Sequence, residues 1–119
     1  MLFEYMNKYS GMGYMTHEKY SYSEVIDEET AAQLAEVFRA FSDPNRVRII
    51  SALRWGRMNV GAIAESVGIS ESAISHHLRG LRQMRLVRAE KEGRLVYYAL
   101  DDDHIAELYR VGLDHVIHG

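Results

Sequence analysis

Residues 60–100 read VGAIAESVGISESAISHHLRGLRQMRLVRAEKEGRLVYYAL, and no other stretch of the chain says as much about its architecture. Apolar residues recur at helical spacing over residues 60–67 and again over residues 71–84. Gly68 permits a tight turn between these two segments, and Ser70 is a residue type that caps helix N-termini well. The sequence therefore predicts two short helices joined by a glycine turn.

A β-hairpin is expected directly after the second helix. The stretch LVRAEKEGRLVYYAL predicts two strands around the turn Lys91-Glu92-Gly93-Arg94. Upstream, the spacing predicts a helix over residues 27–42 and another that starts at Pro44 and ends by Gly56, and a last helix starts in the aspartate run 101–103. The fold class is mainly α with a small β-hairpin, the layout of a winged helix-turn-helix.

The helix over residues 71–84 has two different sides. Ile74, Leu78 and Leu81 lie close to a common line and form an apolar side. The opposite side carries hydroxyl, imidazole and guanidinium groups, which suit base edges and phosphates in a major groove. We also expect Lys91 and Arg94 at the hairpin tip to contact phosphates. The predicted contacts to double-stranded DNA are Ser72, Ser75, His76, Arg79, Lys91 and Arg94. A solvated helix face is the alternative.

The net charge of −3 is unevenly distributed along the chain. Residues 1–43 hold three basic and eight acidic side chains, and residues 99–119 hold one and five. Residues 44–98 hold ten basic and four acidic side chains. The basic middle coincides with the predicted helix-turn-helix and hairpin, which favours a polyanionic partner for that part of the chain.

Composition excludes several classes of site. There is no cysteine among the 119 residues, so disulfides, thiolate metal sites and cysteine nucleophiles are excluded. No apolar run is long enough to span a bilayer and the N-terminus lacks a signal-peptide core, so we expect a cytoplasmic protein without a membrane partner. Residues 27–119 are expected to form one domain for DNA binding and dimerisation. Residues 1–26 are expected to be an N-terminal arm, disordered or with a small helix.

The C-terminal stretch DDDHIAELYRVGLDHVIHG, residues 101–119, carries possible metal ligands. His104 and His115 are eleven residues apart, which places them on one face of a helix but about 16 Å apart along its axis. They cannot meet on one ion within one chain. Asp102 and His104 would form one half of a site, and His115 and His118 the other. An antiparallel copy of the helix would bring unlike halves together and give two sites per homodimer.

Two of these stretches resemble a known family. SESAISHHLRGLRQMRLVRAEKEGRLVYYALDDDHI and FRAFSDPNRVRIISAL are similar to the ArsR/SmtB family of metal-responsive repressors. The resemblance covers about residues 28–118. It implies a homodimeric repressor whose first and last helices form the dimer interface. Metal binding would weaken its hold on operator DNA.

The same resemblance selects among metal sites. A Cys-x-Cys site of the family corresponds here to Met58-Asn59-Val60, so that thiolate site is absent. The family's Asp-x-His and His-x-x-His pattern on the last helix matches Asp102, His104, His115 and His118. One oxygen and three imidazole nitrogens suit Zn(II) as the effector; Co(II) would bind the same ligands, and Ni(II) prefers more of them.

Other functions stay open at this point. The family resemblance also allows a nickel- or cobalt-responsive repressor that uses extra N-terminal ligands, with His17 as the available one. A winged-helix regulator with a non-metal effector is a second alternative, in which the aspartates only cap a helix. A zinc hydrolase is a poor fit, because four protein ligands would close the coordination position that catalysis needs. We therefore expect no enzyme and no small-molecule substrate.

Overall fold

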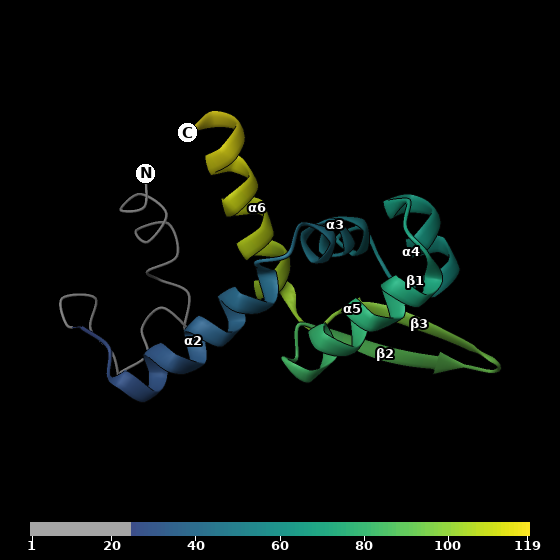
Figure 1. Cartoon of the computed structure of the whole chain (residues 1–119), viewed down its shortest axis with the longest axis horizontal. Coiled ribbons are helices and arrows are strands. Elements are labelled where there is room, and N and C mark those ends of the chain that lie inside the picture. The colour runs from purple at the N-terminus through teal and green to yellow at the C-terminus, as the bar shows by residue number, and fades with distance from the viewer. Residues whose placement is uncertain (1–24) are drawn as a thin grey trace. The chain divides into compact units, whose positions relative to one another are not determined.

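The computed structural model of the chain describes residues 25–119 (Figure 1). Tertiary contacts divide the chain into two units, Met1–Gln33 and Leu34–Gly119. Of the first unit, the described part begins helix α2 (Glu28–Phe41), and the Asp27 carboxylate accepts the N–H of Thr30 at 2.7 Å. The predicted arm over residues 1–26 lies outside the described residues except for its last two. Among residues 25–119, no helix has the length and apolar composition that crossing a membrane requires.

The second unit contains the predicted helix-turn-helix and hairpin. Strand β3 lies between β1 and β2 and pairs antiparallel with both. The prediction of a mainly α fold with a winged helix-turn-helix is confirmed. The elements after α2 are α3 (Pro44–Leu53), β1 (Met58–Asn59), α4 (Val60–Val67), α5 (Glu71–Gln83), β2 (Val87–Glu92), β3 (Leu95–Leu100) and α6 (Asp103–His118).

Polar side chains and one glycine fix where these helices begin and end. Asp43, Asn59 and Ser70 each accept a hydrogen bond from a backbone N–H of the first turn of α3, α4 and α5, respectively. Gly68 ends α4 with φ of +82°, and its N–H donates to the Ala64 carbonyl at 2.7 Å. A side chain at that φ would be strained, so glycine sets the tight turn between α4 and α5.

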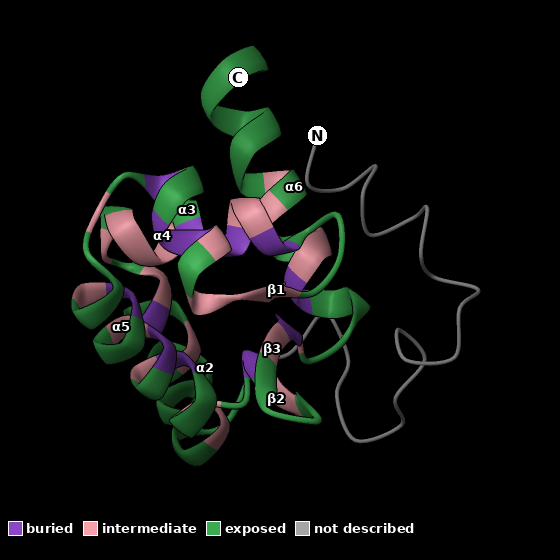
Figure 2. Cartoon of the chain, turned by 90° about the vertical axis from the view of Figure 1, so that its right-hand side faces the viewer, coloured by how far each residue is buried: buried purple, intermediate pink, exposed green. Residues whose placement is uncertain are grey.

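The core lies where the inner sides of α3, α4 and α5 meet, shown in purple in Figure 2. The largest fully buried side chains are Ile49, Ile50, Ile63, Ile74, Leu78, Leu81 and Leu86. Helix α6 contributes one buried residue, Ile105, and every residue from Gly112 onward is exposed. The core therefore holds the base of α6 and leaves its outer half without support from the described part of its own chain.

The hairpin differs from the sequence prediction in two ways. A third, two-residue strand, β1, pairs with β3 through Met58 and Tyr98. The turn is also shorter than predicted, because Lys91 lies within β2 opposite Val96 and only Gly93 and Arg94 connect the strands. Gly93 has φ of +63°, the conformation that a two-residue hairpin turn requires at its first position. Arg94 is thus at the tip, and Lys91 lies below it.

Candidate nucleic-acid interface and metal-binding residues

Helix α5 presents the two sides that its sequence predicts. Ile74, Leu78 and Leu81 are buried in the core. The four predicted DNA-contacting residues on this helix are all exposed: Ser72, Ser75, His76 and Arg79. An exposed row of hydroxyl, imidazole and guanidinium groups can donate to phosphate oxygens and to base edges. Their contact with DNA stays a prediction.

A groove between α5 and the hairpin extends this surface. Its volume is about 440 Å³, and it is lined by Ser75, Arg79, Arg82, Gln83 and Tyr98. Arg82 and Tyr98 were not among the residues that the sequence singled out. Arg82 lies three residues after Arg79 and so shares its side of the helix, a signal that was available in the sequence. Tyr98 comes from β3, and only the pairing of the sheet brings it here. Two guanidinium groups beside a phenol suit an anionic backbone.

A contact from α3 holds the middle of α5. The Arg46 Nε donates to the Nδ1 of His77 at 3.3 Å, and the His77 side chain is half-buried. The guanidinium of Arg46 also lies over Gly80, where a Cβ would come within 2.6 Å of its Nη2 atom. The absence of a side chain at Gly80 therefore allows Arg46 to cross α5 closely.

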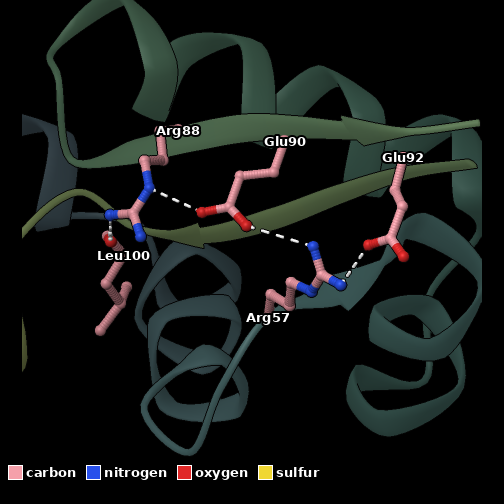
Figure 3. Close-up of polar contacts among 5 residues, drawn as sticks. All are labelled: Arg57, Arg88, Glu90, Glu92 and Leu100. Atoms are coloured by element: carbon pink, nitrogen blue, oxygen red, sulfur yellow. Dashed lines mark hydrogen bonds and ion pairs between the residues drawn. The ribbon is translucent and has the colours of Figure 1, made fainter.

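Alternating charges form a ladder along the hairpin, with its residues Arg88, Glu90, Arg57 and Glu92 shown in Figure 3. Arg88 Nε donates to Glu90 at 2.8 Å, Arg57 Nη1 donates to Glu90 at 3.4 Å, and Arg57 Nη2 pairs with Glu92. The hydrogen bond from Arg88 lowers the pKa of Glu90 below its usual range, and Arg57 adds to the effect. The ladder neutralises several charges of the basic middle region and leaves Lys91 and Arg94 exposed at the hairpin's far end.

The first half of the predicted metal site is assembled within one chain. Asp102 is the N-cap of α6, and its Oδ1 accepts from the N–H groups of His104 at 2.9 Å and Ile105 at 3.3 Å. The other carboxylate oxygen, Oδ2, lies 3.5 Å from the Nδ1 of His104. Capping therefore fixes the Asp102 carboxylate with one oxygen beside the imidazole, a pairing that suits a divalent cation.

The second half lies at the other end of the same helix. His115 and His118 are exposed in the last turns of α6, and His118 Nε2 lies 4.0 Å from Asp114 Oδ1. Because α6 is one continuous helix, His104 and His115 are separated by about 16 Å along its axis. Within residues 25–119 of a single chain, no three histidine or carboxylate side chains come together as metal ligands. The four predicted ligands thus form two separate pairs, and His17 lies outside the described residues.

Comparisons with known proteins identify the family of the chain. A family model described as "Bacterial regulatory protein, arsR family" matches residues 43–89, from the N-cap of α3 into β2. A transcriptional repressor SmtB homolog from Synechocystis sp. is 46% identical over 93 residues, 78% of this chain and 70% of the relative. The HTH-type transcriptional regulator NmtR from Mycobacterium tuberculosis is 36% identical over 107 residues, 90% of this chain and 89% of the relative.

Solved structures show the same fold. The solution structure of apo-NmtR matches with a TM-score of 0.68 and 38% identity over 81% of each chain. A homodimeric winged helix-turn-helix domain from Mycobacterium bovis, a possible ArsR-family regulator, matches with a TM-score of 0.68 and 30% identity over 79% of this chain and 94% of that one. These relatives are transcriptional regulators, which confirms the prediction of a DNA-binding regulator that is not an enzyme. The chain belongs to the arsR family of bacterial regulatory proteins.

Proposed function

We propose that the protein is a transcriptional repressor that binds operator DNA as a homodimer and is released by Zn(II) held between its C-terminal helices. The observation that carries this proposal is the arrangement of α6, with Asp102 and His104 paired at its start and His115 and His118 exposed at its end. A twofold axis between two antiparallel α6 helices would pair each start with the partner's end. The Synechocystis relative is named a repressor and a SmtB homolog, which supports the same reading.

Exposed apolar side chains support the dimer. Helix α6 leaves large apolar side chains in solvent along its length, and α2 does so from its middle onward. Patches of this kind on an isolated chain are typical of surfaces that bury against a partner. The side chains are Leu34, Phe38, Leu108, Leu113, Val116 and Ile117. The homodimeric state of the Mycobacterium bovis domain, which shares the fold, supports the same assembly.

The residues present fit Zn(II) by their chemistry. Asp102 and His104 of one chain and His115 and His118 of the other would hold it, giving one oxygen and three nitrogens. Bound there, the ion would cross-link the two C-terminal helices. The lack of cysteine argues against a thiophilic ion as the effector, even though a cadmium resistance regulator from Staphylococcus aureus is 38% identical over 84 residues.

DNA binding would use the exposed side of α5 and the hairpin. Ser72, Ser75, His76 and Arg79 would enter a major groove, and Lys91 and Arg94 would reach the flanking phosphates. In a dimer, the two α5 helices would meet half-sites about 34–36 Å apart. If metal favours a dimer arrangement that fits DNA poorly, then DNA must weaken metal binding by the same factor.

Fluorescence anisotropy on the protein's own promoter DNA, at fixed ionic strength, tests the proposal. We expect tight binding that one Zn(II) per monomer weakens tenfold or more, within the usual range of such couplings. His115→Ala should still bind the DNA but no longer respond to zinc. Arg110→Met, which changes an exposed residue paired with Glu107 on the same helix, is the matched control and should respond like the unaltered protein. If Zn(II) still releases the His115→Ala variant from DNA, the assigned ligands are refuted.

The identity of the metal is tested in the same assay. Co(II) is expected to act at the same four ligands, and a stronger response to Ni(II) would favour the alternative in which His17 adds a ligand. DNA binding that ignores all three ions would favour a non-metal effector. The proposal also divides the chain into an N-terminal arm over residues 1–26 and a functional domain over residues 27–119. It includes a cytoplasmic location, where the protein would meet the chromosome.

A further inference from the structure

The charge ladder begins at the turn that carries Asp102. Arg88 lies on β2, and its Nη1 donates to the carbonyl oxygens of Leu100 at 2.6 Å and Asp101 at 2.9 Å. Figure 3 shows the guanidinium lying between the Leu100 carbonyl on one side and the Glu90 carboxylate on the other. One side chain on β2 therefore binds the last residue of β3 and the residue before the N-cap of α6.

These bonds restrain the backbone immediately before Asp102. The Asp101 carbonyl belongs to the peptide group that joins Asp101 to Asp102, and a peptide group is planar. Fixing that oxygen therefore orients the N and Cα atoms of Asp102. The Asp101 N–H is held as well, because it donates to the Leu86 carbonyl at 3.0 Å. Two contacts thus fix the backbone that enters α6: the hydrogen bond from Asp101 to Leu86, the residue just before β2, and the hydrogen bonds from the Arg88 guanidinium.

The side chain of Asp102 is then fixed by its cap. Oδ1 is committed to the N–H groups of His104 and Ile105, so the direction of Oδ2 follows from the position of the backbone. Oδ2 is the oxygen beside the His104 imidazole. A displacement of the Leu100–Asp101 backbone would therefore move this oxygen relative to the imidazole.

The rest of the ladder holds Arg88 in place. Glu90 accepts from both Arg88 and Arg57, and the guanidinium of Arg57 stacks over the Tyr97 ring at 4.4 Å from its centroid. A guanidinium can hold several acceptors in one plane, which an ammonium group cannot do. Arg88 and Asp102 also line one cavity of about 360 Å³, which places them at the same junction of hairpin and helix.

We propose that Arg88 is a positioning residue for the metal ligand Asp102, acting through the Leu100 and Asp101 carbonyl groups. The inference rests on the proposed function, because it gives Arg88 a role at the same metal site. Residues that orient metal ligands typically change metal affinity by 10- to 100-fold when they are replaced. We therefore expect Arg88→Met to weaken metal binding at least tenfold, and Arg88→Lys to restore only part of the loss.

Co(II) is the probe, because its visible absorption reports both affinity and ligand geometry. The full chain is titrated with Co(II) without DNA, and Zn(II) affinity is measured by competition with a chromophoric chelator. Arg88→Met should show a weaker affinity and an altered Co(II) spectrum close to that of Asp102→Asn. Arg110→Met removes an equally exposed arginine from α6 and should leave affinity and spectrum unchanged. Circular dichroism and sedimentation are used to check that each variant is folded and has the same oligomeric state.

A double-mutant cycle separates positioning from general destabilisation. If Arg88 acts through Asp102, then adding Arg88→Met to Asp102→Asn should change the Co(II) affinity by less than twofold. A further tenfold loss in the double variant, or an Arg88→Met affinity within threefold of the unaltered protein, would overturn the inference. Arg88→Lys gives the same cycle with the charge retained. An unaltered protein that binds neither Co(II) nor Zn(II) would instead refute the proposed function.

Discussion

Asp102 has two separable tasks in this structure, and substitutions at this position can distinguish them. Its Oδ1 caps α6, and its Oδ2 lies beside His104 as a possible metal ligand. Asparagine caps helices as well as aspartate does but lacks the negative charge of a carboxylate ligand. Alanine can neither cap the helix nor bind a metal. Asp102→Asn should therefore leave the metal-free stability nearly unchanged, and Asp102→Ala should lower it.

The size of the difference follows from the cap. Replacing an N-cap aspartate by alanine costs about 1 kcal/mol, which lowers the midpoint of thermal unfolding by about 4 °C for a domain of this size. Asp102→Asn loses only the interaction of a charge with the helix dipole, a few tenths of a kcal/mol. In both variants Zn(II) affinity should fall tenfold or more, because the charged oxygen ligand is gone. Both variants should then show little of the added stability that zinc gives the unaltered protein.

Thermal unfolding by circular dichroism, with chelator and with excess Zn(II), measures both effects at a fixed protein concentration. Asp103→Asn is the matched control, because it removes a carboxylate from the same turn and leaves the cap intact. Equal metal-free stabilities of Asp102→Ala and Asp102→Asn would refute the capping argument. A zinc-dependent rise in the unfolding midpoint of Asp102→Asn equal to that of the unaltered protein would show that the aspartates only cap the helix.

Arg79→Ala and Arg82→Ala should each weaken binding to the promoter and leave Zn(II) affinity unchanged. If Arg82 contacts a phosphate, Arg82→Ala should also reduce the slope of log affinity against log salt concentration by about one. Gly68→Ala should cost about 1–2 kcal/mol in denaturant unfolding, because φ is +82° there, and an unchanged midpoint would contradict the strain. Arg88→Met should raise the pKa of Glu90 toward its usual range in an NMR titration of the carboxyl group, although Arg57 still lowers it. Since the folded-state pKa of Glu90 is lowered, its ion pairs contribute above the unfolded-state pKa, and that contribution is lost as pH falls through the folded-state value.

Local signals explain why much of the fold could be predicted from the sequence. Pro44 after Asp43, and Ser70 after Gly68, mark helix boundaries through contacts within a few residues, and the structure places α3 and α5 there. Strand β1 has no such signal, because two residues carry no periodicity and their strand geometry comes from pairing with β3, about 39 residues further along the chain.

The candidate site divides in the same way. Asp102 and His104 could be paired from the sequence because a cap and the next residues are always close. The role inferred for Arg88 could not be predicted from the sequence. Its hydrogen bonds reach carbonyl groups 12 and 13 residues further along the chain, and they depend on the register of β2 with β3. Lys91 was misplaced at the tip for a related reason: the strand pairing continues to Glu92 and Leu95, so the turn takes only two residues.

The outer half of α6 links metal binding to dimerisation. Of the sixteen residues of this helix only Ile105 is buried, and the turns that carry His115 and His118 make no contribution to the core of the described chain. Most of the stability of a helix in a protein comes from tertiary packing of its apolar face, which the outer half of α6 lacks within the described chain. In the proposed dimer, Leu113, Val116 and Ile117 would supply that packing against the partner. A variant with polar residues at these three positions should therefore lose both the dimer and the second pair of ligands. Sedimentation together with Co(II) titration measures the two losses, and a monomer that still binds Co(II) tightly with the unaltered spectrum would contradict a site shared between chains.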